Sequence, residues 1–162
     1  MSALVPRVGC GAAIVRDGRL LLVKRLTPPE SGSWSLPGGK VEFGESLAGA
    51  VAREIREELG VEIAIERPLT IVETPNVDGQ HWIAPVYLAR LAAGEPRNCE
   101  LDKHDFIEWF PLDRPPAPLS AAARAAFAAL GGGGARRRRR AANRRRFFLS
   151  RGKACAAAQP SR

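Results

Sequence analysis

The segment between Gly39 and Val61 places the strongest constraint on how this chain can fold. From Ser46 to Leu59 its apolar residues recur at helical spacing, which predicts an amphipathic helix with one face packed on a sheet. Ser46 is a suitable N-cap for this helix, and Gly60 is a suitable stop at its C-terminal end. The expected buried stripe consists of Leu47, Ala48, Val51, Ala52, Ile55 and Leu59.

Short apolar runs rich in β-branched residues surround this helix. Asp-Gly pairs at residues 17–18 and 78–79 each separate two such runs, and Asp-Gly is a strong signal for a two-residue hairpin turn. The sequence therefore predicts two β-hairpins. The expected strands cover residues 8–15, 20–23, 61–74, 81–91 and 106–110, and an alanine-rich helix is expected over residues 119–130.

The basic residues are concentrated at the C-terminal end of the chain. The formal net charge is +8, but residues 131–162 hold eleven Arg or Lys and no acid, which leaves 14 basic against 17 acidic residues in 1–130. We expect one domain over residues 1–130 and a Gly/Arg-rich disordered tail over 131–162. The tail's arginines favour salt-dependent binding to polyanions, so it is either a nucleic-acid tether or an extension without function.

The cysteine pattern and the apolar runs bear on the cellular compartment. Three cysteines without a CxxC pair argue against a disulfide framework and against a structural zinc site. No apolar run is long enough to span a membrane, and no secretion leader is visible. We therefore expect a cytoplasmic protein with no membrane partner, and the oligomeric state cannot be read from the sequence.

Three carboxylates share one side of the helix between Ser46 and Leu59. At about 100° per residue, Glu54, Glu57 and Glu58 fall within one arc of roughly 100° that borders the apolar stripe. Like charges at this spacing are unfavourable by about 0.2–0.5 kcal/mol per pair, whereas a hard divalent cation between them reverses the sign. The alternative is a solvated helix face held by ion pairs with residues such as Arg53.

The residues on either side of these glutamates favour a metal site over a solvated helix face. The 23-residue segment matches every fixed position of the Nudix box, so the chain resembles the MutT-like Nudix hydrolases over roughly residues 5–130. This resemblance implies an α/β/α sandwich, with a mixed β-sheet between helices and the box as a loop, helix and loop beside the sheet. The matched positions are Gly39, Glu45, Arg53, Glu54, Ile55, Glu57, Glu58, Gly60 and Val61.

The resemblance also implies roles for individual residues. Glu54, Glu57 and Glu58 would be the principal Mg²⁺ ligands, with Glu45 and the Gly39 carbonyl near the metal, Arg53 as an orienting partner and Mn²⁺ as a substitute ion. Glu57 is our first choice for the general base, although Glu54 is also a catalytic candidate and Glu100 and Asp105 are loop candidates. We expect His104 to be a surface histidine.

The substrate is less constrained than the metal site. Residues 43–46 resemble members that cleave nucleoside or deoxynucleoside triphosphates to a monophosphate and pyrophosphate, while ADP-ribose or another nucleoside diphosphate derivative is the alternative. A third possibility is a non-catalytic module that binds nucleotide or RNA. Substrate-binding candidates are Lys24, Arg25 and Lys40 for phosphates and Trp34, His81 and Trp82 for base stacking, unless the aromatics pack internally and the basic residues are simply exposed.

Overall fold

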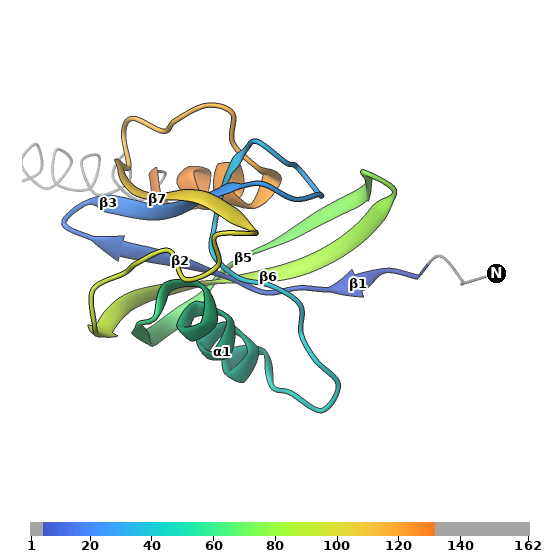
Figure 1. The fold of residues 1–162 in the computed structure, drawn as a ribbon, viewed down its shortest axis with the longest axis horizontal. Helices are drawn as coiled ribbons and strands as arrows, with labels where there is room; N and C mark the ends of the chain where they lie inside the picture. Colours follow the sequence, from blue (N-terminus) through green and yellow to red (C-terminus); the bar gives the residue numbers. More distant parts are fainter. Residues whose placement is uncertain (1–4, 132–162) are drawn as a thin grey trace, which may run out of the picture.

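The structure of the chain is a computed structural model that describes residues 5–131 (Figure 1). Its strands are β1 (Arg7–Val8), β2 (Gly11–Arg16), β3 (Arg19–Arg25), β4 (Trp34–Ser35), β5 (Glu62–Val77), β6 (Gln80–Ala93) and β7 (His104–Pro111). The helices are α1 (Leu47–Leu59) and a second helix over residues 121–131. The predicted tail after residue 131 lies outside the described residues.

Both predicted hairpins are confirmed, because β2 and β3 pair in antiparallel fashion, as do β5 and β6. Each turn has positive φ at both central residues, with 50° at Asp17 and 72° at Gly18 in the first and 49° at Asp78 and 70° at Gly79 in the second. These values belong to the type I′ turn, whose twist matches that of the strands it joins. The turn residues therefore set where each hairpin reverses.

The seven strands form one mixed sheet. β6 pairs with β5 in antiparallel fashion and with β1 and β2 in parallel fashion, while β3 pairs in antiparallel fashion with β2, β4 and β7. The sequence analysis did not identify β1 and β4. These two-residue strands form through pairing with distant partners, such as Trp34 of β4 with Lys24 of β3, and have no local pattern of their own.

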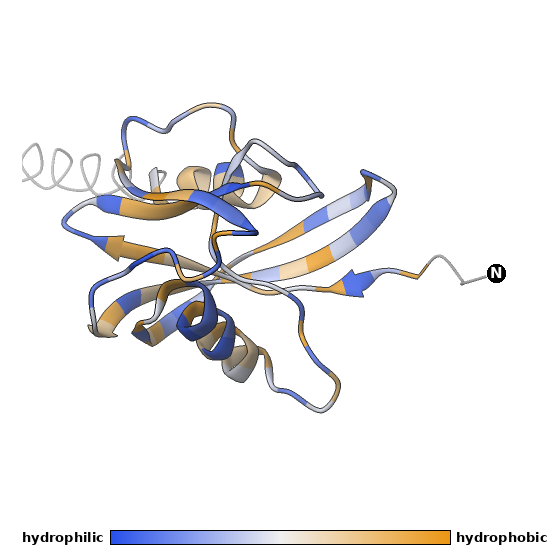
Figure 2. Ribbon diagram, in the orientation of Figure 1, coloured by the Kyte–Doolittle hydropathy of each residue, from blue (hydrophilic) through white to orange (hydrophobic). Residues whose placement is uncertain are grey.

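Two helices cover opposite faces of this sheet, which confirms the predicted sandwich (Figure 1). Leu21 and Val23 of β3 belong to the core beneath α1, whereas Leu20 and Leu22 belong to the core beneath the helix over residues 121–131. Strand β3 is therefore apolar on both faces, and Figure 2 shows hydrophobic β2 and β3 between the two helices. Neither helix within residues 5–131 is long and apolar enough to cross a membrane.

Helix α1 has the predicted ends but a different buried face. The Ser46 side chain accepts a hydrogen bond from the Gly49 amide, and Gly60 ends the helix in the left-handed conformation with φ of 68°. Leu47 and Ala48 are exposed, so their place in the expected stripe was wrong. Glu54 and Glu58 are buried instead, because Ala50, Glu54 and Glu58 line up at four-residue spacing beside the apolar row Val51, Ile55 and Leu59.

Candidate active site

Arg53 holds three of the glutamates together. Its Nε and Nη2 donate to the two carboxylate oxygens of Glu45 at 2.9 and 3.0 Å, and its Nη1 donates to Glu54 Oε1 at 2.9 Å and to Glu57 Oε2 at 3.2 Å. Its Nη2 also donates to the Lys40 carbonyl oxygen at 3.0 Å. These hydrogen bonds lower the pKa of Glu45 and raise that of Arg53, so the ion pairs keep both groups charged.

Glu54 lies against the backbone of Gly39. A methyl group at Gly39 would collide with the Glu54 carboxylate, so the close approach requires glycine here. The Gly39 carbonyl accepts a hydrogen bond from the Cys10 amide at 2.8 Å, which fixes this loop to the start of β2. Burial raises the pKa of Glu54, and the hydrogen bond from Arg53 opposes that shift.

Glu58 is the most buried carboxylate of the box, with 3% of its surface exposed. Burial raises the pKa of Glu58 to about 8, although the Gly38 amide donates to its Oε2 at 2.8 Å and favours the charged form. Gly38 has φ of 142°, and a Cβ there would collide with the Cys10 carbonyl. The sequence pair Gly38-Gly39 therefore lets the loop pass between β2 and the carboxylates of α1.

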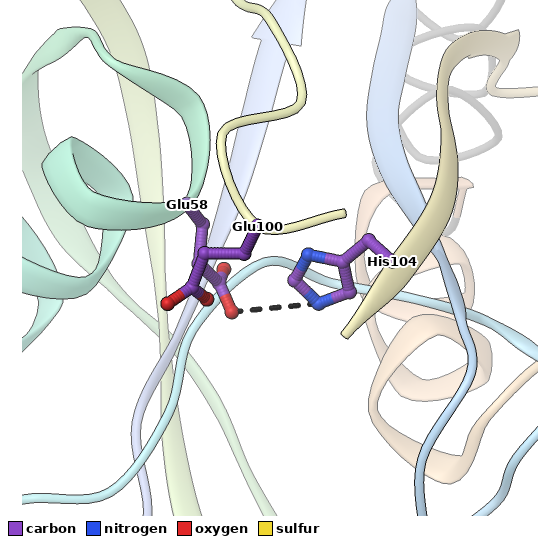
Figure 3. Close-up of side chains that lie close together, drawn as sticks. All are labelled: Glu58, Glu100 and His104. Atoms are coloured by element: carbon purple, nitrogen blue, oxygen red, sulfur yellow. Dashed lines mark ion pairs between the residues drawn. The ribbon is translucent and has the colours of Figure 1, made fainter. Parts of the chain in front are cut away.

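The loop that follows β6 adds two further side chains to this site. It is attached to the end of α1 by hydrogen bonds from the Cys99 amide to the Glu58 carbonyl at 2.9 Å and from the Arg97 amide to the Leu59 carbonyl at 3.1 Å. Glu100 and His104 then face Glu58 from the loop and from the start of β7 (Figure 3). His104 Nε2 lies 3.5 Å from Glu58 Oε1.

The expectation that His104 is a surface histidine was wrong, since only 3% of its surface is exposed. Burial lowers its pKa, and the nearby Arg25 guanidinium adds to that effect, so the neutral imidazole is favoured. Its Nδ1 is buried without a hydrogen-bond partner among the described residues, as is Glu100 Oε2. Leaving such an atom unpaired costs about 1–3 kcal/mol, so both atoms need a partner, a water or a ligand, that residues 5–131 do not supply.

A cavity of about 330 Å³ opens beside these carboxylates. Glu54, Glu58 and His104 line it, together with the basic residues Arg25, Lys40 and Lys103. Most of its apolar lining comes from alternate residues of paired strands, since Trp82, Ala84 and Val86 of β6 lie opposite Thr74, Val72 and Thr70 of β5. All of these except Thr70 line the cavity, as do Leu36 and Ala122.

The structure separates the six substrate-binding candidates into two groups. Arg25, Lys40 and Trp82 line the cavity, and the other three do not. The Lys24 ammonium lies 5.2 Å from the ring centre of Trp34, and Trp34 packs edge-on against Phe110 at 4.8 Å. His81 Nε2 lies 3.2 Å from Glu73 Oε1 on the hairpin.

The carboxylate candidates divide in a similar way. Glu54 and Glu58 face the cavity, whereas Glu45 and Glu57 pair with Arg53 and do not line it. Of the two loop candidates for the base, Glu100 joins the cluster around Glu58, while Asp105 is exposed. Thr74, Ala84 and Val86 also line the cavity and were not among the predicted binding residues, although the two-residue alternation along the strand from Trp82 points to Ala84 and Val86.

A family model for the NUDIX domain matches residues 5–130. The chain belongs to this family. The carboxylates of α1 and the Gly38-Gly39 loop are thus the Nudix box in its folded form, and the chain is a MutT-like Nudix hydrolase, as the sequence predicted.

Similar Nudix proteins act on several nucleotides. The chain is 34% identical over 122 residues to a Mycobacterium tuberculosis protein named "Putative 8-oxo-dGTP diphosphatase 2", covering 68% of this chain and 85% of that one. It is 38% identical over 93 residues to an ADP-ribose pyrophosphatase of Methanocaldococcus jannaschii, covering 57% and 55%. A MutT NUDIX hydrolase structure from Burkholderia pseudomallei is 55% identical with a TM-score of 0.71, covering 77% of this chain and 98% of that chain.

Proposed function

We propose that this Nudix hydrolase is a Mg²⁺-dependent pyrophosphohydrolase that cleaves a nucleoside or deoxynucleoside triphosphate to a monophosphate and pyrophosphate. The observation that carries the proposal is the pair of buried glutamates, Glu54 and Glu58, in the wall of the cavity. Buried carboxylates are costly unless a cation compensates their charge, and both line a cavity that also has basic lining residues. We also propose that residues 1–130 form the hydrolase domain.

The donor set fits a hard divalent cation. Glu54 and Glu58 supply oxygens at the cavity wall, and the unpartnered Oε2 of Glu100 lies in the same cluster. Mg²⁺ favours oxygen ligands and completes its shell with waters and phosphate oxygens. Glu45, Glu57 and the Gly39 carbonyl are the further proposed ligands. When bound, such an ion offsets negative charge on the phosphates and lowers the pKa of a water.

Basic residues near the carboxylates suit the phosphate chain. Arg25 and Lys40 line the same cavity as Glu54 and Glu58, and Arg25 is held by a hydrogen bond from its Nε to the Pro29 carbonyl at 2.8 Å. Lys103 is paired with Glu100 Oε1 at 2.8 Å and also lines the cavity. These cations can orient a triphosphate with its anhydride bonds near Glu54 and Glu58.

The apolar lining residues of the cavity suit a nucleobase. The Trp82 ring offers a stacking surface, and the small Ala84 leaves room beside it. The similarity to a protein named for 8-oxo-dGTP supports a triphosphate substrate, whereas the similarity to an ADP-ribose pyrophosphatase supports the alternative, a nucleoside diphosphate derivative. A cytoplasmic location and a nucleic-acid role for residues 131–162 stay predictions.

Glu57 and Glu100 are the two candidate bases. Glu57 was the first choice from the sequence, but its side chain is 51% exposed and pairs with Arg53. Glu100 lies in the cluster with Glu58, so it is better placed beside the proposed phosphate position. A comparison of Glu57→Gln with Glu100→Gln, with Mg²⁺ affinity measured for both, decides between them. Loss of the base lowers kcat by about 10²–10⁴-fold with the metal still bound, whereas loss of a ligand weakens metal binding.

A panel of nucleotides with Mg²⁺ tests the proposed function. Products are identified by mass for the native chain, Glu58→Gln and the control Glu66→Gln, whose side chain lies on β5 away from the cavity. We expect a monophosphate and pyrophosphate from the native chain and the control, and only background from Glu58→Gln. If ADP-ribose is the only substrate and AMP and ribose 5-phosphate are released, the alternative substrate class is favoured. If the native chain, Glu58→Gln and Glu66→Gln all show only background hydrolysis, the chain is a non-catalytic binding module.

A further inference from the structure

We propose that Glu58, Glu100 and His104 form a mixed oxygen and nitrogen site for a divalent first-row transition-metal ion, with the His104 imidazole as a metal ligand. Each residue offers one ligand atom, and these atoms all lie within 4.8 Å of one another (Figure 3). The ligands implied by the Nudix box are oxygens only, so a nitrogen ligand changes which ions the site prefers. Metal binding here does not require that the chain hydrolyse a triphosphate.

The backbone of the loop brings Glu100 and His104 to the same side. The amides of Lys103 and His104 both donate to the Glu100 carbonyl, at 3.0 and 2.9 Å, which closes a helix-like turn. Residues four apart on such a turn have neighbouring side chains. Asn98 fixes the turn from outside, since its Nδ2 donates to the His104 carbonyl at 2.7 Å and its Oδ1 accepts from the Glu100 amide at 3.2 Å.

Two buried polar atoms, one on each of these side chains, indicate a missing partner. His104 is 3% exposed, and its Nδ1 has no hydrogen-bond partner within residues 5–131. Lys103 satisfies only one oxygen of Glu100, and the other, Oε2, is buried and also has no partner in that range. Buried polar atoms are rarely left unpaired in folded proteins. A metal ion supplies the partner that Glu100 Oε2 lacks, and when His104 Nε2 binds this ion, Nδ1 is the ring nitrogen that donates to a water.

The separation of His104 from Glu58 fits metal ligands better than a hydrogen bond. His104 Nε2 lies 3.5 Å from Glu58 Oε1, which is long for a hydrogen bond between nitrogen and oxygen. With metal–ligand bonds of about 2.1 Å, adjacent ligands of an octahedral ion lie roughly 3 Å apart. A small adjustment of the three side chains therefore suffices to place one ion between them.

The nitrogen ligand predicts the class of ion. Imidazole suits zinc, copper, iron and nickel, and affinity for a mixed nitrogen and oxygen site rises along the first-row series from manganese to copper. Mg²⁺ favours an all-oxygen shell and gains little from imidazole. We therefore expect this site to bind transition-metal ions more tightly than Mg²⁺, with Mn²⁺ as the most convenient probe.

Pulsed electron paramagnetic resonance on the full chain with Mn²⁺ alone tests the proposal. A directly bound imidazole gives a nitrogen hyperfine coupling, and the sequence has two histidines, His81 and His104. His104→Gln removes the proposed ligand, while His81→Gln is the matched control, since His81 pairs with Glu73 on the hairpin and does not line the cavity. We expect the coupling in the native chain and in His81→Gln, and its loss in His104→Gln.

Calorimetry provides the second measurement. We expect His104→Gln to weaken Mn²⁺ binding at least about tenfold, because loss of even an outer-shell partner costs about 10- to 100-fold, and to change Mg²⁺ binding far less. Bound Mn²⁺ without nitrogen coupling in the native chain would overturn the proposal, and this result does not depend on how any variant folds. The proposed hydrolysis is not contradicted by that result. Conversely, nitrogen coupling in a chain that hydrolyses no nucleotide would support the metal site and contradict the proposed function.

Discussion

The high pKa of Glu58 makes the stability of the metal-free protein depend on pH. The folded protein holds a proton on Glu58 up to pH of about 8, whereas the unfolded chain releases it near pH 4.5. Between these values the folded state binds more protons, so the free energy of unfolding falls as pH rises. The fall is at most about 1.4 kcal/mol per pH unit, or roughly 5 kcal/mol over the whole interval.

Urea unfolding in the presence of EDTA, at pH values from 5 to 9, measures this dependence. We expect the native chain to lose at least about 2 kcal/mol as the pH rises from 5 to 8, because water entry reduces the full effect. Glu58→Gln removes the titrating group and should lose most of this decline, because only the smaller decline caused by Glu54 and an opposing rise caused by the lowered pKa of His104 remain. Glu66→Gln is the control and should follow the native curve. Equal slopes for Glu58→Gln and the native chain would refute the reasoning.

Three further predictions concern the Gly38-Gly39 loop, the ion pairs of Arg53 and the proposed stacking of the nucleobase on Trp82. Gly38→Ala should lower the free energy of unfolding by at least about 2 kcal/mol in denaturant titrations, because a methyl group meets the Cys10 carbonyl, while Gly32→Ala, with open space around it, should cost less. Arg53→Lys should lower kcat roughly tenfold or more, since an ammonium cannot hold Glu45 and Glu54 together, and an unchanged kcat would contradict this. Trp82→Ala should raise KM more than it lowers kcat in steady-state assays.

The elements defined by local chemistry could be predicted from the sequence. Asp17-Gly18 and Asp78-Gly79 adopt positive φ with little strain, so both hairpins were identified from two residues each. Ser46 and Gly60 mark the ends of α1 because capping depends on neighbouring backbone groups. The spacing of the box was sufficient to place Glu54 and Glu58 at one site.

The features that depend on distant contacts could not be predicted. His104 looks like a surface residue in the sequence, and it is buried because the Cys99 amide binds the Glu58 carbonyl and brings the loop onto α1. Trp34 resembles a stacking residue, but β4 places it against Phe110 in the core. In both cases the side chain's environment is set by residues more than 35 positions away in the sequence. A pattern of neighbouring residues contains no information about such contacts.

Calorimetric titration of Mg²⁺ into the full chain, with a non-hydrolysable nucleotide present, tests the central claim most directly. The claim is that the glutamates brought together by α1 need a hard cation, and that this cation acts on a bound diphosphate group. We predict binding at millimolar Mg²⁺ or tighter in the native chain, strengthened by the nucleotide, and its loss in Glu54→Gln and Glu58→Gln. A native chain that binds neither Mg²⁺ nor Mn²⁺ under these conditions would contradict the account.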